Sequence, residues 1–178
     1  LDSVLAQTWN KLELIITDDN SEDDTMDKCV KWVRENNKRF YRYEIVESPV
    51  NTGISGNANR GMKTAKGDWI KFLGADDTLV SSCIADNMEW IGLHPEIEVL
   101  FSRVRVFANS FCQSNLIGTV PEIPYDPEGI LAQGRDASSQ YRMLLASDRI
   151  HFSPSVFINR KVLDTLGGFN EDYRMFED

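Results

Sequence analysis

The amino-acid sequence predicts an α/β protein with a layered, mostly parallel sheet and helices on both of its faces. Short apolar runs alternate along the chain with stretches whose apolar residues recur at helical spacing. Strands separated by helices favour a parallel sheet, because a parallel pair needs a crossover connection. Two of the apolar runs end directly in a pair of acidic residues. Ligands of such sheets bind beyond the carboxyl ends of the strands, so both acidic pairs are expected at a ligand-binding edge.

The first part of the chain begins with a helical pattern, in which apolar residues recur at Leu1, Val4, Leu5 and Trp9. Apolar runs then predict strands over residues 13–17, 43–48 and 69–73. Between the first two strands, Ser21 and Asp24 resemble a capping box that opens a helix. Between the second and third strands, an apolar stripe from Ile54 to Ala65 predicts a helix that Gly67 ends.

The second part of the chain is less regular. An apolar stripe over residues 84–91 predicts a helix that His94 and Pro95 stop, and residues 99–107 are expected to form one longer strand. Residues 109–137 are rich in Pro, Gly and polar residues, which indicates a long loop. The pattern then predicts a short helix over 138–147, a strand over 155–158 and a helix over 160–166.

Composition and charge restrict the class of protein. The chain has 178 residues, 42% of them hydrophobic, which is enough for a single domain over residues 1–178. Its formal net charge of −9 argues against a nucleic-acid partner. The three cysteines form no CxxC pair, which favours a reducing compartment such as the cytoplasm. The helical pattern begins at the first residue, and the last residues have no closing Gly, Pro or polar tail. The chain is therefore expected to be a fragment truncated at both ends.

Acidic pairs stand at the ends of two predicted strands, Asp18-Asp19 and Asp76-Asp77. Either pair taken alone could simply cap the helix that follows, because Asp is a favoured capping residue. Two adjacent carboxylates also repel each other, and a bound cation relieves that repulsion. Two such pairs at strand ends therefore indicate a metal-assisted site for a phosphorylated ligand.

The same residues belong to stretches that together resemble family 2 glycosyltransferases with the GT-A fold. The stretches follow the order of the family: Ser3 to Trp9, Leu12 to Ser21, Asn51 to Gly61, Gly67 to Asp77, Leu166 to Asn170, and the final pair Glu177-Asp178. The family's central first strand has no counterpart in the sequence. Residues 13–17 and 69–73 are therefore not expected to pair directly with each other.

The resemblance implies roles for residues at matching positions. It implies that Asp19 binds the base of a nucleotide-sugar donor, with Asn51, Gly53 and Asn59 in the second donor-binding block. Asp76 matches an acid near the ribose or the metal. Asp77 matches the carboxylate that coordinates Mn²⁺ or Mg²⁺ on the donor diphosphate.

The catalytic base implied by the resemblance is Asp178, with Glu177 as its neighbour and alternative. The family often has an Asp at the position of Gly74, three residues before the metal-binding Asp. It also has an Arg at the position of Ala58, and the sequence departs from the family at both places.

The function implied is transfer of a sugar, with inversion, from a nucleotide-sugar donor, expected to be a UDP-sugar, to an acceptor hydroxyl in polysaccharide or glycan biosynthesis. The acceptor expected is a carbohydrate or a lipid-linked group, and peripheral membrane association at the cytoplasmic face and a homo-oligomer are compatible with it. A nucleotidyltransferase and a non-catalytic nucleotide-sugar-binding relative are the alternatives. The first of these usually carries an early Gly-rich loop with Arg and Lys, which the sequence lacks.

Overall fold

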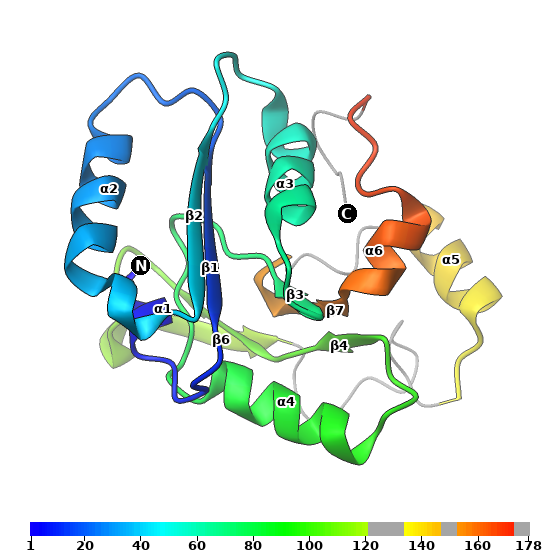
Figure 1. Cartoon of the computed structure of the whole chain (residues 1–178). Coiled ribbons are helices and arrows are strands. Elements are labelled where there is room, and N and C mark those ends of the chain that lie inside the picture. The colour runs from blue at the N-terminus through cyan, green and yellow to red at the C-terminus, as the bar shows by residue number, and fades with distance from the viewer. Residues whose placement is uncertain (121–133, 147–152, 173–178) are drawn as a thin grey trace. The chain divides into compact units, whose positions relative to one another are not determined.

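The structure, a computed structural model, describes residues 1–120, 134–146 and 153–172 (Figure 1). Its packing divides the chain into two compact units, residues 1–100 with 157–178 and residues 101–156. Helices and strands alternate along both, which confirms the α/β class. The organisation of residues 1–178 as one domain stays a prediction.

The first unit holds two sheets. Its elements are α1 (Asp2–Leu5), β1 (Glu13–Asp18), α2 (Thr25–Asn36), η1 (Asn37–Arg39), β2 (Arg42–Glu47), α3 (Gly53–Thr64), β3 (Trp69–Lys71), α4 (Cys83–Leu93), β4 (Val99–Phe101), β7 (Val156–Asn159) and α6 (Arg160–Leu166). Strands β1 and β2 pair in parallel, with Glu13 opposite Arg42 and Asp18 opposite Glu47. A separate sheet has the order β3-β7-β4. Strands β1 and β3 therefore do not pair with each other, as the sequence predicts.

The second unit contains β5 (Val104–Phe107), η2 (Gln113–Asn115), β6 (Leu116–Val120), α5 (Ala137–Ala146) and η3 (Ser153–Ser155). Strands β5 and β6 form an antiparallel pair with an irregularity between Val106 and Phe107. The predicted strand over 99–107 is thus divided into β4 and β5. The predicted loop over 109–137 contains β6, because Leu116 to Val120 can pair with β5 through a short connection that needs no crossover helix.

Parallel pairing does not predominate among the described strand pairs whose register is known. Strands β1 and β2 are parallel, whereas β3–β7 and β5–β6 are antiparallel. The prediction of a mostly parallel sheet extended the strand–helix alternation to every strand. That rule fails for β6, which follows β5 through a turn, and for β7, which the chain reaches only after the second unit.

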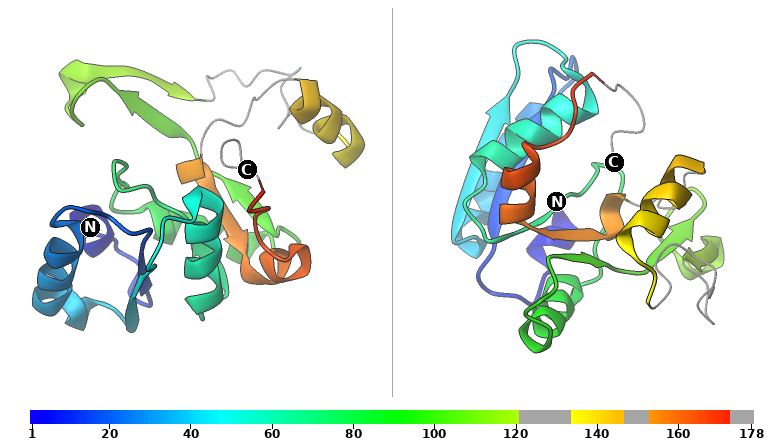
Figure 2. Two further views of the ribbon diagram at one scale, coloured as in Figure 1. Left: turned by 90° about the horizontal axis from the view of Figure 1, so that it is seen from above. Right: turned by 90° about the vertical axis from the view of Figure 1, so that its right-hand side faces the viewer.

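Helices cover both faces of the β1–β2 pair, with α2 on one side and α3 on the other (Figures 1 and 2). A core cluster lies between α2 and the strands, formed by Leu14, Val33 and Phe40. Around β7 and α6, the buried side chains are Phe157, Ile158 and Leu163. The core cluster thus packs β1 against α2.

Three predicted helix boundaries are wrong. Helix α1 ends at Leu5, so the helical pattern does not continue to Trp9. Helix α2 begins at Thr25, and Ser21 bonds to Asp18 instead of forming a capping box with Asp24. Helix α3 ends at Thr64 with Ala65 in an extended conformation, so Gly67 does not end it. The Gly67 amide donates instead to the Glu13 carboxylate. Helix α6 ends as predicted, at Gly167 in the left-handed conformation.

Among the residues that the structure describes, no helix has the length and apolar character needed to cross a bilayer.

Candidate functional site

The first acidic pair ends β1, and its two members point to different partners. Asp18 is buried, and its carboxylate accepts hydrogen bonds from the backbone N–H and the hydroxyl of Ser21, at 2.8 and 2.5 Å. Between them Asn20 adopts a positive φ of 70°, a conformation that Asn tolerates better than most residues. Asp18 therefore stabilises the turn after β1.

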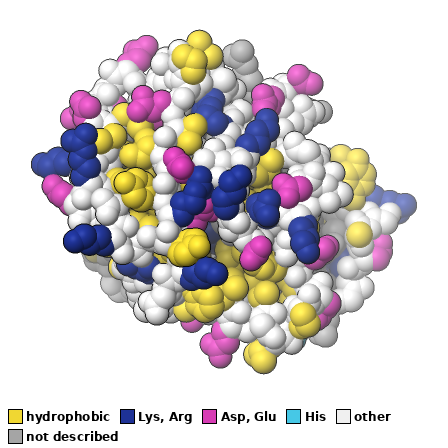
Figure 3. Space-filling model, in the orientation of Figure 1, with side chains coloured by type: hydrophobic (Ala, Val, Ile, Leu, Met, Phe, Trp, Pro, Cys, Tyr) yellow, Lys and Arg dark blue, Asp and Glu magenta, His cyan; other side chains and the backbone are white. Residues whose placement is uncertain are grey.

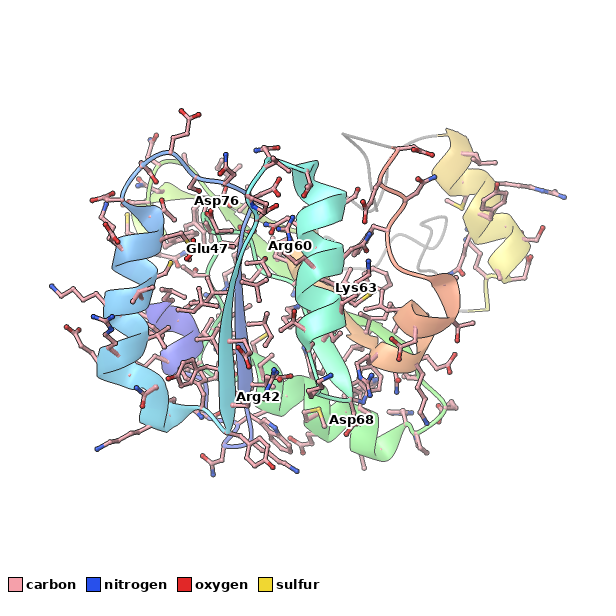
Figure 4. All side chains as sticks on the ribbon, turned by 45° about the horizontal axis from the view of Figure 1, so that its top comes forward. Arg42, Glu47, Arg60, Lys63, Asp68 and Asp76 are labelled. Carbon is pink, nitrogen blue, oxygen red and sulfur yellow. The ribbon has the colours of Figure 1, made fainter. Side chains whose placement is uncertain are left out.

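Asp19 reaches across to the start of α3. One of its carboxylate oxygens accepts the backbone N–H groups of Thr52 and Gly53, at 2.8 and 2.7 Å. The other accepts the Thr52 hydroxyl at 2.6 Å and the Arg60 guanidinium at 3.2 Å. Figure 4 shows Arg60 and Lys63 on different sides of α3, with Arg60 toward the strands. The carboxylate therefore joins β1 to the N-terminus of α3, where a negative charge is favourable.

These hydrogen bonds determine the charge state of Asp19. Desolvation alone would raise the pKa of Asp19, but the hydrogen bonds from Thr52, Arg60 and Gly53 outweigh it and hold the pKa below its usual value. The group is an anion at neutral pH. Asp19 thus lies at the carboxyl end of β1, as the sequence predicts. Its carboxylate also caps the N-terminus of α3.

Asn51 and Gly53 shape the turn that leads into α3. Gly53 has a φ of 81°, a conformation that favours glycine, and its N–H also lies 3.2 Å from the Asn51 side-chain oxygen. Asn51 is exposed. Together they present the backbone N–H groups of the turn to Asp19.

Asn59 lies on α3 with only 3% of its surface exposed. Its amide oxygen accepts the N–H of Phe169 at 2.8 Å. Its amide nitrogen donates to the carbonyl of Phe169 and to the carboxylate of Glu171, both at 2.9 Å. Both amide hydrogens are thus committed to the segment that follows α6, and neither is left for a donor ligand.

The second acidic pair follows β3 in a turn where the Asp77 N–H donates to the Gly74 carbonyl at 3.2 Å. A Cβ added at Gly74 would lie 2.9 Å from an Asp76 carboxylate oxygen and 3.4 Å from one of Asp77. Both carboxylates therefore face the space that the glycine leaves free. Desolvation and the neighbouring Asp76 charge raise the pKa of Asp77.

The donor set of this pair suits Mg²⁺ or Mn²⁺, which bind oxygen ligands and often use one or two carboxylates together with substrate phosphates. Within the described ranges, no group of three or more His, Cys, Asp or Glu side chains could hold a metal ion. Asp76 and Asp77 are a pair of carboxylates, fewer than the ligands of a complete coordination shell.

The predicted base, Asp178 with Glu177, lies outside the described residues. The described part of that segment ends at Asp172, shortly after the residues that Asn59 holds. Sequence reasoning missed Thr52, Arg60 and Glu171 as members of the site. Thr52 and Arg60 belong to the same sequence block as Asn51, and that position was the available signal. The link from Glu171 to Asn59 spans more than a hundred residues and left no local signal.

Acidic and basic side chains are mixed on the face of the molecule that Figure 3 shows. Figure 3 shows Lys and Arg side chains near the middle of the face, with Asp and Glu side chains interspersed around them.

Comparison with known proteins decides the family. The family model described as Glycosyl transferase family 2 matches residues 1–165, which include both acidic pairs and α3. The chain belongs to glycosyl transferase family 2. This confirms the family that the sequence motifs indicate.

Among its relatives is a PGL/p-HBAD biosynthesis glycosyltransferase of Mycobacterium tuberculosis, 26% identical over 100% of this chain and 59% of the relative. Another is the Escherichia coli UDP-Glc:alpha-D-GlcNAc-diphosphoundecaprenol beta-1,3-glucosyltransferase WfaP, 30% identical over 70% of this chain and 47% of the relative. The chain thus spans about half the length of the relatives it matches.

Among solved structures, the chain resembles Staphylococcus aureus TarS 1–349 in complex with UDP. The TM-score is 0.68 at 22% identity, over 99% of this chain and 46% of that one. At this identity the likeness shows the fold, and it confirms the predicted GT-A architecture.

Proposed function

We propose that the chain forms the donor-binding part of an inverting glycosyltransferase that uses a nucleotide sugar, with UDP as the nucleotide. The family match over residues 1–165 carries the proposal, because it includes the acidic pair that follows β3 in a GT-A fold. The printed name of one relative specifies UDP-Glc as its donor, and a structural neighbour binds UDP. Both support a uridine nucleotide here.

The donor diphosphate is assigned to the turn after β3. Asp77, with Asp76 beside it, would hold Mn²⁺ or Mg²⁺ there. Such an ion neutralises the charge that develops on the leaving nucleoside diphosphate. Two facing carboxylates in a protein of net charge −9 are a poor anion site by themselves, so the proposal includes metal dependence.

The nucleoside is assigned to the edge formed by the end of β1 and the turn before α3. Asp19 would accept an N–H of the base there in place of one of the four hydrogen bonds that it now accepts from Thr52, Gly53 and Arg60. Its present partners at Thr52, Gly53 and Arg60 hold the carboxylate ionised, as that role requires. Asn51 is exposed at the same turn and is available to the donor.

Transfer with inversion needs one carboxylate to take the proton from the acceptor hydroxyl while the donor bond breaks in line. Asp178, or Glu177 beside it, is assigned this role. The acid that holds the diphosphate and the acid that takes the proton are then different groups. Asp77 and Asp178 would consequently fail in different ways when substituted.

The acceptor in this proposal is a carbohydrate or a lipid-linked group, and a relative named for a diphosphoundecaprenol-linked sugar supports it. We place the reaction in polysaccharide or glycan biosynthesis at the cytoplasmic face of a membrane. Cys29, Cys83 and Cys112 are all free thiols in the structure, which is compatible with a reducing compartment. A homo-oligomer remains part of the proposal.

The test is calorimetry with UDP in Mn²⁺ and in a chelator. The parent should bind UDP more tightly with Mn²⁺, and Asp77→Ala should remove that difference. Glu89→Ala is the matched control, because it deletes an exposed carboxylate on α4. UDP-Mn²⁺ binding by Asp77→Ala equal to that of the parent would refute the metal assignment. Turnover of a nucleoside triphosphate with a sugar phosphate, without sugar transfer, would replace the proposal with a nucleotidyltransferase.

A further inference from the structure

The side-chain amide of Asn59 makes the same pair of hydrogen bonds with the Phe169 backbone as a neighbouring β-strand would make. It accepts the backbone N–H and donates to the backbone carbonyl of the same residue, at 2.8 and 2.9 Å. Only a side chain with an adjacent donor and acceptor satisfies both groups at once, which Asn provides and Asp or Leu does not. Because Asn59 is buried, loss of either bond would leave a polar group without water to replace the partner.

The backbone opposite Asn59 is built for this close approach. Gly168 has a φ of 94°, and a Cβ at that position would lie 2.4 Å from the Asn59 amide oxygen. The preceding Gly167 has a similar φ of 81°, yet a Cβ there would meet nothing within 4 Å. Gly167 is thus explained by the end of α6, whereas Gly168 is explained by contact with Asn59.

Phe169 extends the contact to the strand that precedes the second acidic pair. Its ring meets that of Phe72 edge to face, with centroids 5.4 Å apart and planes at 76°. Phe72 directly follows β3 and precedes Asp76 in the sequence. Figures 1 and 2 show the segment after α6 beside α3 in all views. One short segment therefore contacts both the helix capped by Asp19 and the start of the turn with Asp76-Asp77.

We propose that Asn59 is a positioning residue for sugar transfer: it fixes residues 168–171, which lead within a few positions to Glu177-Asp178, against the donor side of the site. The inference rests on the proposed function and adds a role that differs from donor binding. Groups that act on one sugar ring must be held in a narrow geometry, and a displacement of ~1 Å can cost about 100-fold in rate. Weakening this link should therefore impair transfer more than donor binding.

Asn59→Asp is the first variant, because it conserves volume while removing both N–H donors and placing a carboxylate against that of Glu171. We expect UDP affinity within about threefold of the parent and a transfer rate lower by roughly 10- to 100-fold. The ratio of sugar transfer to donor hydrolysis should fall, because an attacking water can pass its proton to bulk water and needs no bound acceptor in a fixed position. Adding Glu171→Gln to this variant removes the charge repulsion and should restore part of the ratio.

Gly168→Ala and Gly167→Ala form the matched pair. Both place Ala at a positive φ and so carry similar backbone strain. Only Gly168→Ala pushes a methyl group into the Asn59 amide, so only it should lower the ratio of transfer to hydrolysis. Equal effects of the two substitutions would show that strain, and not the link to Asn59, is responsible.

Hydrogen exchange in the intact protein supplies a readout that does not depend on turnover. The Phe169 amide should exchange faster in Asn59→Leu, which removes the oxygen that accepts its N–H, while the Thr52 and Gly53 amides bonded to Asp19 should not. Unchanged exchange at Phe169, or an unchanged ratio in both Asn59→Asp and Gly168→Ala of an active parent, would overturn the inference and leave the proposed function intact. A parent that neither binds UDP nor transfers sugar would refute the proposed function, and the role in transfer with it.

Discussion

Replacing Asp19 by Asn tests whether its carboxylate holds β1 against α3. The amide oxygen of Asn can still accept the N–H groups of Thr52 and Gly53, but as neutral hydrogen bonds, which are roughly half as strong as those to an anion. The amide nitrogen then faces the Arg60 guanidinium, donor against donor, and the ion pair at 3.2 Å is lost. With the Asp19 and Arg60 side chains 15% and 20% exposed, solvent screens this pair only in part.

The magnitude follows from these losses. Weakening two hydrogen bonds from charged to neutral costs about 1 kcal/mol each. Loss of the partly screened ion pair and of the charge at the helix N-terminus adds a few tenths to 1 kcal/mol. We therefore expect Asp19→Asn to lower the free energy of unfolding by about 2–3 kcal/mol at pH 7, measured by urea denaturation without ligand.

The effect should depend on pH with a defined sign. The pKa of Asp19 is lower in the folded protein than its usual value near 3.8, so the folded state favours the anion. This stabilisation is complete above the usual value and is lost as pH falls through the lower, folded value. The difference between the parent and Asp19→Asn should therefore shrink below about pH 4. Glu89→Gln, an exposed control on α4, should stay within ~0.5 kcal/mol of the parent. A difference below about 0.5 kcal/mol at pH 7 for Asp19→Asn, or one that grows in acid, would refute the reasoning.

Other parts of the first unit give sharp expectations. The Arg39 side chain donates hydrogen bonds to four backbone carbonyls between Leu5 and Asn10. Arg39→Lys retains the charge but not the fork of donors, so it should lower the free energy of unfolding by roughly 1–3 kcal/mol in urea denaturation. An unchanged midpoint would contradict that role. Gly74→Ala should change the free energy of unfolding by less than about 0.5 kcal/mol, because its methyl group meets only movable carboxylates. It should weaken Mn²⁺-dependent UDP binding in calorimetry. Binding equal to that of the parent would show that Gly74 is not needed at the metal site. Leu163→Ala removes a side chain that is 4% exposed and should lower the free energy of unfolding by about 2–5 kcal/mol, measured by thermal or urea unfolding. A loss under about 1 kcal/mol would mean that neighbouring side chains fill the space.

Local patterns in the sequence were sufficient to predict most helices and strands of the first unit. Strand β1 and helix α3 follow from apolar periodicity, because each buries one face or stripe in the core. The pair Asp18-Asp19 lies at the end of β1 as predicted, whereas Asp76-Asp77 lies in a turn beyond the end of β3 at Lys71. Strand β6 was missed because Pro, Gly and polar residues dominate the stretch around it, and the residues of β6 gain their pairing only from β5.

Contacts between residues far apart in sequence were beyond prediction from the residues alone. Asp19 could be placed at the edge, but not its engagement with Thr52, since that depends on the distance at which α3 packs on β1. Asn59 belonged to a motif whose implied role was donor binding. Its bonds to Phe169 appear only when the segment after α6 is folded onto α3. Family motifs thus identified these residues as members of the site, and only the packing of the chain shows their hydrogen-bond partners.

The chain order of the first unit has a consequence for how the protein is made. Strand β3 pairs with β7, and the whole second unit is synthesised between them. At ~5–20 residues per second on the ribosome, β3 waits on the order of ten seconds for its partner. During that time its backbone groups and the apolar side chains of Trp69 and Ile70 lack the contacts that later cover them. Slower translation downstream of β3, or a shortage of chaperones that shield nascent chains, should therefore lower the yield of folded protein more than similar changes before β2 is complete.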